Sequence, residues 1–379
     1  MNKKKILFLT GTRADFGKLK SLIKISRDSN LFEVHIFATG MHLQKEFGYT
    51  VNEIVKSGFD NIHKFSNHTS EKSMDLTLAK TIEGLSAYTK KNAFDLILVH
   101  GDRVETLAGA IVGSMNNILV GHIEGGEVSG TIDELIRHSV SKLSHIHFVA
   151  NQEAKKRLLQ MGELESQIFV IGSPDIDIMF SNQLPQISEA LNYYDIPFES
   201  YNILMFHPVT TEEKIGEYAK QLAQAVLEDD GNYIVIKPNN DKGSSQVNKA
   251  LKKLENNSRF ISFPSLRFEY FLVLLKHCQF IIGNSSAGVR EAPHYGITSI
   301  DIGSRQLNRV KAPSIIHSSY EKSDIKSAIS QAKLSTNNSL STSMFGQGNS
   351  NQLFINLLKS SVLWQIPCQK QFKDRALKG

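Results

Sequence analysis

Short apolar runs recur along the chain, and stretches of helix length separate them. We interpret the following runs as strands: Ile6–Thr10, Val34–Thr39, Leu96–His100, Ile118–Ile123, His147–Ala150, Ile168–Ile171, Ile203–His207, Tyr233–Lys237, Phe260–Phe263, Phe280–Gly283 and Ser299–Ile302. Runs that are apolar on both faces and alternate with helices are typical of parallel sheets covered by helices. The pattern therefore predicts an α/β protein with doubly wound sheets.

The series of strands pauses in the middle of the chain, in a segment that contains Pro185 and Pro197. We place a domain junction at 172–200, which predicts an N-terminal domain over 1–172 and a C-terminal domain over 173–352. A chain of 379 residues suits two such domains. The Ser/Asn-rich stretch Leu334–Ser350 is expected to be a loop, and Leu353–Leu363 a terminal helix.

Polar residues follow seven of the predicted strands directly. Ligands of doubly wound sheets bind beyond the carboxyl ends of the strands. We therefore expect the two domains to face each other across a cleft that holds the functional site. The segments concerned are Gly11–Gly17, Gly40–His42, His100–Arg103, His122–Glu127, His207–Pro208, Lys237–Asn239 and Gly283–Ser286.

The segment Gly283–Glu291, Gly-Asn-Ser-Ser-Ala-Gly-Val-Arg-Glu, follows an apolar strand and opens a helical stretch. Small residues leave backbone N–H groups uncovered at a helix N-terminus, where phosphate binds well. An ordinary serine N-cap would explain one serine but not the whole segment. The segment is neither a GxxxxGK[ST] loop nor a GxGxxG fingerprint, which disfavours an ATPase or a simple dehydrogenase.

Three arginines adjoin the predicted loops. Arg13 lies in the turn Gly-Thr-Arg-Ala-Asp at 11–15, Arg103 follows Asp102, and Arg305 follows the strand Ser299–Ile302. A guanidinium suits bidentate binding of phosphate. A plain ion pair with the neighbouring aspartate is the alternative for Arg13 and for Arg103.

Four carboxylates lie in glycine-rich loops at or just after strand ends: Asp102, Glu124, Glu127 and Asp133. Carboxylates gathered in one cleft can have separated pKa values, so that one acts as acid and another as base. Two alternatives stay open, a metal cage with His100, His122 or His138, and carboxylates that cap helices. Of the histidines next to these loops, which are His42, His138 and His207, the last is the best candidate for a site residue.

Composition narrows the class of protein. The chain is 41% hydrophobic and 21% charged, and its first apolar run is too short for a signal peptide. Cys278 and Cys368 allow neither a disulfide framework nor a cysteine zinc site. We expect a soluble protein of a reducing compartment. The net charge of +5 is spread along the chain, which disfavours nucleic acid and suits an anionic small molecule equally well.

Five motifs, in this order, resemble the hydrolysing UDP-N-acetylglucosamine 2-epimerases of the bacterial sialic-acid pathway, which supplies capsule polysaccharide. The resemblance covers nearly the whole chain. It implies two Rossmann-like domains arranged as in GT-B glycosyltransferases, with residues 353–379 packing back on the first domain. The motifs are Gly11–Asp15, His100–Arg103, His122–Glu127, Thr131–His138 and Gly283–Glu291.

The resemblance also implies roles for individual residues. In the first domain the catalytic residues would be Asp102, Glu124 and Asp133, oriented by Arg103 and His42. In the second, Ser285, Ser286 and Glu291 would hold diphosphate and ribose, and the backbone of Leu266 would contact uracil. The remaining substrate-binding positions would be Arg13, Gly17, His207, Asn239 and Arg305.

The reaction implied by the resemblance removes the C2 proton of UDP-N-acetylglucosamine and expels UDP to give 2-acetamidoglucal. Water then adds with inversion at C2 and yields N-acetylmannosamine. The resemblance implies no metal or other cofactor, no nucleic-acid or membrane partner, a dimer or tetramer, and a cytoplasmic location.

Several alternatives to this reading stay open. They are the same reaction on UDP-2,4-diacetamido-2,4,6-trideoxyglucose of the legionaminic-acid pathway, the reversible epimerase that adds UDP back, a GT-B glycosyltransferase, and a nucleotide-sugar sensor. The Arg-Ala-Asp form of the first loop and the loop Glu-Gly-Gly-Glu-Val-Ser-Gly at 124–130 favour the hydrolysing branch.

Overall fold

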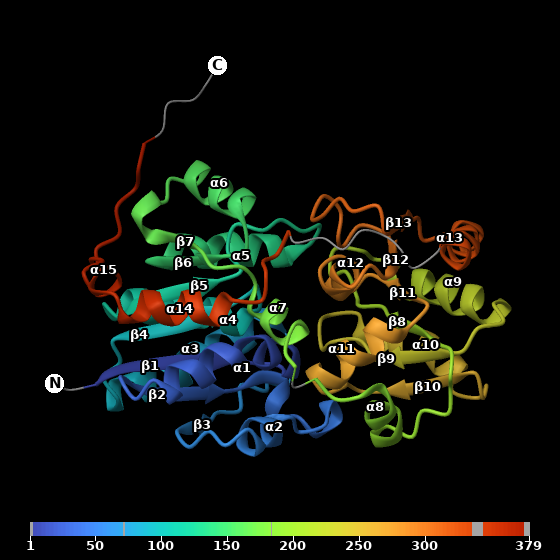
Figure 1. The fold of residues 1–379 in the computed structure, drawn as a ribbon, viewed down its shortest axis with the longest axis horizontal. Coiled ribbons are helices and arrows are strands. Elements are labelled where there is room, and N and C mark those ends of the chain that lie inside the picture. The colour runs from blue at the N-terminus through green and yellow to red at the C-terminus, as the bar shows by residue number, and fades with distance from the viewer. Residues whose placement is uncertain (1–2, 71–72, 183, 336–343, 375–379) are drawn as a thin grey trace. The chain divides into compact units, whose positions relative to one another are not determined.

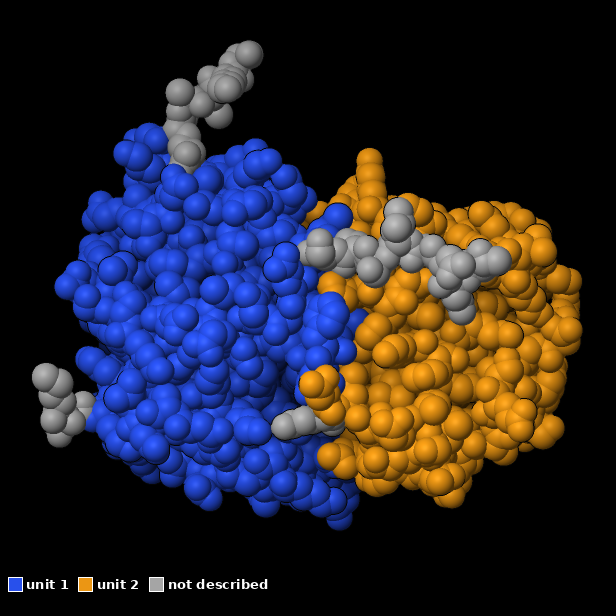
Figure 2. All heavy atoms as spheres, in the orientation of Figure 1, with its two compact units in different colours: residues 1–127, 133–181, 344–379 blue, residues 128–132, 182–343 orange. Residues whose placement is uncertain are grey.

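The computed structural model describes residues 3–70, 73–182, 184–335 and 344–374. The chain forms two compact units, which Figure 2 shows in different colours. Unit 1 comprises residues 1–127, 133–181 and 344–379, and unit 2 comprises residues 128–132 and 182–343.

Unit 1 contains a sheet of parallel strands in the order β3-β2-β1-β4-β5-β6-β7 (Figure 1). The strands are β1 Lys4–Thr10, β2 Phe32–Ala38, β3 Ile62–Lys64, β4 Leu96–His100, β5 Leu119–Ile123, β6 Ile146–Val149 and β7 Ile168–Val170. The α-helices are α1 Arg13–Asp28, α2 Val51–Lys56, α3 Met74–Lys91, α4 Val104–Met115, α5 Ile132–Leu143, α6 Gln152–Gln160, α7 Pro174–Met179, α14 Ser350–Lys359 and α15 Ser361–Trp364. Within its described residues, unit 1 also has the 3-10 turns η1 Gly40–Leu43, η2 Lys45–Phe47 and η3 Glu165–Gln167.

Unit 2 contains a second parallel sheet, in the order β10-β9-β8-β11-β12-β13. Its strands are β8 Asn202–Met205, β9 Tyr233–Ile236, β10 Phe260–Phe263, β11 Phe280–Gly283, β12 Thr298–Ile302 and β13 Ile315–Ser318. Its helices are α8 Ile187–Tyr193, α9 Ile215–Glu228, α10 Ser244–Leu251, α11 Phe268–His277, α12 Glu291–His294 and α13 Lys322–Leu334, with 3-10 turns η4 Lys252–Leu254 and η5 Ser286–Gly288.

The predicted α/β class is confirmed, and every apolar run interpreted as a strand is one. The sequence pattern missed β3 and β13, which are the outermost strands at one edge of each sheet. All residues of β4 and β5 are buried, whereas β3 and β13 contain only intermediate and exposed residues. An edge strand packs on one side only, so it lacks the continuous apolar run that identifies a central strand.

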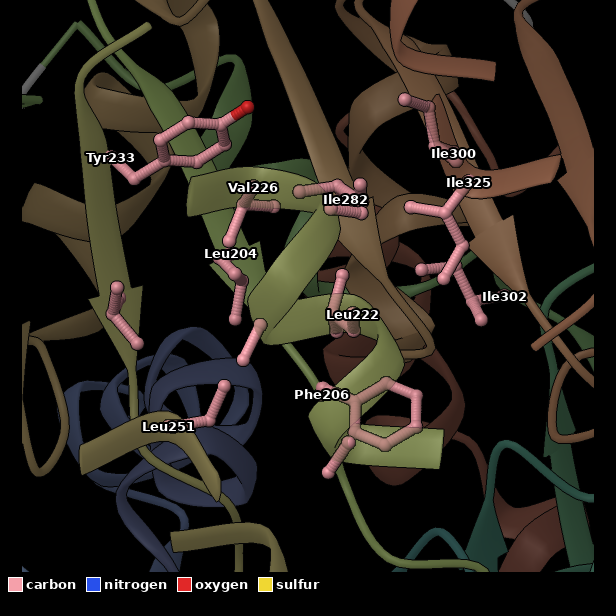
Figure 3. Close-up of a cluster of buried hydrophobic side chains, with 14 of the residues drawn as sticks. Leu204, Phe206, Leu222, Val226, Tyr233, Leu251, Ile282, Ile300, Ile302 and Ile325 are labelled. Atoms are coloured by element: carbon pink, nitrogen blue, oxygen red, sulfur yellow. The ribbon is translucent and has the colours of Figure 1, made fainter. Parts of the chain in front are cut away.

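Each sheet is buried beneath helices. In unit 2, side chains of the sheet and of α9, including Leu204, Leu222 and Val226, form the core drawn in Figure 3. In unit 1 the terminal helix α14 covers the sheet, and the ring of Phe354 lies 5.0 Å from that of Phe148. At about 25 cal/mol per Å² of apolar surface, these cores provide most of the driving force for folding.

The strand order reverses at one point in each sheet, between β1 and β4 in unit 1 and between β8 and β11 in unit 2. The helices that follow the two strands lie on opposite faces at such a point, so their connecting loops separate and leave room for a ligand. The turns after β1, β4, β8 and β11 are therefore the first places to look for function.

The compact units differ from the predicted domains in their bounds. Helix α7 and residues 344–352 belong to unit 1. The Asp177 carboxylate in α7 accepts hydrogen bonds from the backbone amides of Ser350 and Asn351, both at 2.7 Å, at the start of α14. These hydrogen bonds join residues that are far apart in the sequence. The pattern of apolar and polar residues therefore could not indicate that α7 and residues 344–352 belong to unit 1.

The expected terminal helix is two helices. Ser360 has ψ 138°, which ends α14, and its hydroxyl accepts the amide of Val362 to begin α15. Part of the expected loop Leu334–Ser350, residues 336–343, lies outside the described residues. A search of the described helices finds none that is both long and apolar enough to span a membrane.

Candidate active site

The turn after β1 is closed by Asp15. Thr12 is the N-cap of α1, and the Asp15 carboxylate accepts the amides of Gly11 and Thr12 at 2.9 and 3.1 Å. The Asp15 carboxylate, which the ion-pair alternative assigned to Arg13, therefore takes part in a capping box. Arg13 is the first residue of α1, and its Nη2 lies 4.0 Å from Oε1 of Glu53. Gly17 is buried one turn further along α1.

His42 lies in η1, beneath this turn, and is fully buried. Its Nε2 lies 3.0 Å from the hydroxyl of Thr10, and its Nδ1 lies 2.8 Å from the hydroxyl of Thr50. Burial lowers the pKa of His42 to about 4, although Asp15 opposes the change, so the imidazole is neutral at pH 7. Its contacts support the turn after β1 rather than the carboxylates, which the resemblance expected it to orient.

Arg137 in α5 gathers the acidic residues of unit 1. Its side chain is fully buried, its Nη2 contacts Oδ2 of Asp102, and its Nη1 donates to the carbonyl of Glu127 at 3.2 Å. Burial alone would lower the pKa of Arg137, but the negative charges around it outweigh burial and raise it. The groups responsible are Asp102, Glu127, Glu124 and Asp133, which we call the acidic cluster.

Arg137 lies within the motif Thr131–His138, but the sequence pattern predicts no role for it. The spacing along the chain does indicate that Arg137 lies near a carboxylate, because Asp133 and Arg137 are four residues apart on one helix and so share a face. A buried guanidinium carries several N–H donors in a rigid plane, so it fixes the geometry of the carboxylates around it.

Glu124 follows β5 in a strained conformation. Its φ is 72°, a region in which a residue other than glycine costs on the order of 1–3 kcal/mol and which is common at functional sites. Its carboxylate is 6% exposed, and Oε2 lies 2.9 Å from Nε2 of His100, without the alignment of a hydrogen bond. A buried cation also lies beside it, because Nζ of Lys18 is 3.8 Å from Oε2 of Glu124 and 3.5 Å from Oδ2 of Asp175.

Lys18 is a second residue that the sequence analysis missed. It lies on the buried face of α1 between Gly17 and Leu19. A lysine is almost never buried without a partner. The position of Lys18 within the apolar face of α1 therefore indicates that its side chain pairs with a carboxylate.

His122 supports the loop that contains Asp102. This buried histidine donates from Nε2 to the carbonyl of Gly101 at 2.9 Å, and burial lowers its pKa to about 3. As a neutral donor it positions the backbone next to Asp102. Across the part of the chain that the structure describes, no group of three or more His, Cys, Asp or Glu side chains is arranged to hold a metal ion.

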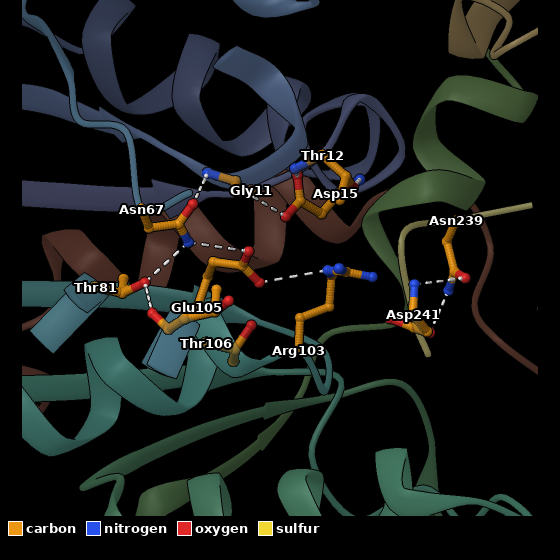
Figure 4. A network of polar contacts seen from close by, with 12 residues as sticks. Gly11, Thr12, Asp15, Asn67, Thr81, Arg103, Glu105, Thr106, Asn239 and Asp241 are labelled. Carbon is orange, nitrogen blue, oxygen red and sulfur yellow. Dashed lines mark hydrogen bonds and ion pairs between the residues drawn. The ribbon is translucent and has the colours of Figure 1, made fainter. Parts of the chain in front are cut away.

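In unit 2, Asn284 brings three of the predicted nucleotide-binding residues together. Its side chain bonds both backbone groups of His207, with the His207 amide at 2.7 Å and the His207 carbonyl at 2.9 Å. Its own carbonyl accepts from Nη1 of Arg305 at 3.2 Å. Nδ1 of His207 accepts the amide of Asn239 at 3.2 Å, so the imidazole proton of neutral His207 is on Nε2. The side-chain amide of Asn239 bonds the Asp241 carboxylate (Figure 4).

The turn after β11 contains only short helical segments, whereas the sequence predicted a longer helical stretch. Ser285 and Ser286 begin the three-residue turn η5, and Glu291 begins the four-residue helix α12. Helices this short have a weak dipole, so an anion here would depend on hydroxyls, amides and Arg305. Gly283 has φ 140°, and a Cβ at this position would lie 1.9 Å from the carbonyl oxygen of Met205, so the turn requires glycine. Glu291 is 2% exposed.

Leu266 lies in the loop between β10 and α11 and is buried. The loop is fastened to α8, because the backbone amide of Arg267 donates to the Tyr194 hydroxyl at 2.8 Å. The Tyr194 ring packs against Phe263 at 5.1 Å. Unit 2 therefore has two features of a candidate site: the loop of Leu266, held by Tyr194, and the polar residues around Asn284 at the switch point.

Two units, each with a parallel sheet whose strand order reverses at one point, define the class of protein: a two-domain α/β protein with Rossmann-like units. The family model described as UDP-N-acetylglucosamine 2-epimerase matches residues 24–359. The chain belongs to this family.

Individual relatives are similar over almost the whole chain. A protein of Neisseria meningitidis serogroup B, named UDP-N-acetylglucosamine 2-epimerase, is 47% identical over 98% of this chain and 99% of its own. A Legionella pneumophila protein, named UDP-N,N'-diacetylbacillosamine 2-epimerase (hydrolyzing), is 31% identical over 98% of each chain. The structure of Methanocaldococcus jannaschii UDP-GlcNAc 2-epimerase with UDP-GlcNAc and UDP has the same fold, with TM-score 0.80 and 21% identity, over 94% of this chain and 99% of that chain.

Proposed function

We propose that this protein is a hydrolysing UDP-N-acetylglucosamine 2-epimerase that releases UDP and N-acetylmannosamine, the first step of sialic-acid biosynthesis. The observation that carries the proposal is the gathering of Asp102, Glu124 and Asp133 around the buried guanidinium of Arg137. The Neisseria relative supports the sugar, and the name of the Legionella relative supports hydrolysis.

The reaction requires two kinds of group. A C2 proton is weakly acidic, so its removal needs a desolvated carboxylate close to C2. As the C2–H bond breaks, the electron pair forms the C1–C2 double bond and the C1–O bond to UDP breaks. Cationic groups stabilise the charge that develops on the departing diphosphate.

We assign these roles to residues of the two units. Asp102, Glu124 and Asp133 serve as the acid–base set, with Arg103 beside them, and the 2-acetamidoglucal is then hydrated by water that adds H to C2 and OH to C1. His207, Asn239, Ser285, Ser286, Glu291 and Arg305 hold diphosphate and ribose together with Arg13 and Gly17, and the backbone of Leu266 contacts uracil.

A time course in deuterated water tests the proposal. The purified protein is incubated with UDP-N-acetylglucosamine and followed by proton and phosphorus NMR. Free UDP with N-acetylmannosamine carrying deuterium at C2 is the expected result. UDP-N-acetylmannosamine would instead indicate the reversible epimerase, and an intact substrate would contradict the proposal for this sugar.

The Legionella relative favours one second candidate, the same reaction on UDP-2,4-diacetamido-2,4,6-trideoxyglucose. The two substrates differ at C4 and C6. A competition assay with equal concentrations of both nucleotide sugars separates the candidates. Faster release of UDP from the N-acetylglucosamine compound is expected, and the opposite order would assign the protein to the trideoxy sugar.

A further inference from the structure

Glu105 is a buried carboxylate that the proposed mechanism does not use. It lies in the first turn of α4, directly after the loop of Asp102 and Arg103, and is 3% exposed. Burial of a carboxylate costs several kcal/mol unless charges or hydrogen bonds compensate it. The groups around Glu105 therefore indicate what the side chain does.

Each carboxylate oxygen of Glu105 faces a different partner (Figure 4). Oε2 lies 3.4 Å from Nε of Arg103, and Oε1 accepts from the side-chain amide of Asn67 at 3.3 Å. Asn67 is itself buried, and its Oδ1 accepts the backbone amide of Gly40 at 3.1 Å. In Figure 4 the guanidinium of Arg103 is turned with Nε towards Glu105 and its far end away from it.

Two glycines make room for this carboxylate. A Cβ at Gly40 would lie 2.6 Å from Oε1 of Glu105, and a Cβ at Gly11 would lie 3.1 Å from its Cδ. Gly40 has φ 60°, so its backbone also disfavours a side chain. The shape of both turns therefore depends on the carboxylate that fills the space beside them.

The contacts of Glu105 reach the carboxyl ends of four adjacent strands. Gly11 follows β1, Gly40 follows β2, Asn67 follows β3 and Arg103 follows β4, and these strands are neighbours in the order β3-β2-β1-β4. This part of the sheet includes the switch point of unit 1. One buried carboxylate thus connects the turns in which Arg13, His42 and Asp102 lie.

We propose that Glu105 is a positioning residue, which holds the guanidinium of Arg103 in place beside the acid–base residues of unit 1. The inference rests on the proposed function. The carboxylate acts through Arg103 and does not touch the substrate. Because a misplacement of about 1 Å in a catalytic group can cost on the order of 100-fold in rate, loss of this support should be visible in kcat.

The variant Glu105→Gln isolates the charge. It keeps the volume between Gly11 and Gly40 and an oxygen for Asn67, and it removes the negative charge next to Arg103. We expect kcat for UDP release to fall on the order of 10- to 100-fold, while KM and the affinity for UDP stay close to wild type. The variant stays folded at the assay temperature, although loss of the buried charge lowers its melting temperature. An unchanged kcat would overturn the proposal.

A double-mutant cycle shows whether Glu105 acts through Arg103. We expect the variant Arg103→Gln to lose at least as much activity, and the double variant Arg103→Gln/Glu105→Gln to be no slower than Arg103→Gln alone. Independent losses that multiply in the double variant would overturn the proposal, because Glu105 would then act without Arg103.

A measurement without turnover separates this inference from the proposed function. Protein labelled with ¹⁵N-arginine is used, and the Nε–H signal of Arg103 is assigned by its absence from Arg103→Gln. Nε of Arg103 faces Oε2 of Glu105 without the alignment of a hydrogen bond, so the test measures side-chain order and not proton protection. We expect the heteronuclear NOE at this Nε to be that of an ordered side chain in the wild type and to be lower in Glu105→Gln. Glu53→Gln, next to Arg13, is the control and should leave the Arg103 signal unchanged. Equal NOE values in wild type and Glu105→Gln would overturn the positioning role even in a protein that proves inactive on this sugar.

Discussion

Arg137 and Asn284 have the same physical role in different units, since each is a buried group that makes several polar contacts and so fixes the loops around it. Arg137 contacts Asp102 and the carbonyl of Glu127, and Asn284 clamps the backbone of His207 and accepts from Arg305. The residues proposed to bind or convert the substrate are thus held by residues to which the proposal gives no contact with it.

Asp102→Asn removes a proposed acid–base group while it keeps the shape of the side chain. General acid–base groups contribute on the order of 10²- to 10⁴-fold to the rate, so we expect turnover to fall by that range. The affinity for UDP, measured by calorimetry, should stay within about twofold of wild type, since Asp102 is not among the residues proposed to bind diphosphate, ribose or uracil. Asp60→Asn, at an exposed position, is the control. Unchanged turnover in Asp102→Asn would remove this residue from the chemistry.

Among the elements, α8 supports the loop that follows β10. The Tyr194 hydroxyl accepts the amide of Arg267, next to Leu266. A typical hydrogen bond contributes about 0.5–1.5 kcal/mol, so Tyr194→Phe should weaken UDP binding by roughly two- to tenfold. We expect kcat to change less than KM. Tyr193→Phe is the matched control, because the Tyr193 side chain is 51% exposed and packs through its ring. Equal affinities for UDP in all three proteins would show that α8 does not order the loop.

The C-terminal segment is fastened to α5 by a buried charge network. Nζ of Lys370 lies 2.6 Å from Oε2 of Glu163 and donates to the carbonyls of Ser141 and Ser144 at the end of α5. Burial alone would raise the pKa of Glu163, but His147, Lys370 and Lys142 outweigh burial and lower it to about 2. A carboxylate with a lowered pKa stabilises the fold above its ordinary value of 4.5. This stability is lost as the pH falls through about 2.

Glu163→Gln tests this network. At pH 7 the variant leaves Lys370 and Lys142 without their carboxylate, and breaking such a buried pair costs about 3–5 kcal/mol. Urea denaturation between pH 7 and 2 should show a lower free energy of unfolding at pH 7 and a smaller loss between pH 4.5 and 2 than in wild type. Glu165→Gln, with a side chain that is 65% exposed, should behave as wild type. Parallel pH curves for Glu163→Gln and wild type would contradict the assignment.

For the whole molecule, each unit has its own sheet and core, and the chain returns to unit 1 at its end. Phe354→Ala removes a fully buried ring of α14 from the core of unit 1. Such a truncation costs about 3–5 kcal/mol, so the melting temperature should fall clearly. The affinity of folded protein for UDP should not change, because the proposed nucleotide contacts are mostly in unit 2. Leu353→Ala, at a 38% exposed position on the same helix, should cost much less. A loss of UDP affinity in folded Phe354→Ala would contradict this separation.

Most of the fold could be predicted from local pattern. Continuous apolar runs identified the strands β4, β5 and β11, since a strand covered on both faces must be apolar throughout. The glycine-rich loops after these strands indicated where Asp102, Glu124 and Ser285 would lie, because loop residues at carboxyl ends share one edge of a sheet. These features depend on neighbours in sequence, which a single sequence contains.

Only the tertiary structure decided which side chains contact one another. Arg137 and Asp102 are 35 residues apart, and Asn284 and His207 are 77 apart. Glu105 meets Asn67 across 38 residues. No periodicity links such positions, because a contact between loops depends on strand order and not on spacing along the chain. The sequence by itself thus determined the elements and the residue types at their ends, and tertiary packing decided which of these groups meet and which are buried together.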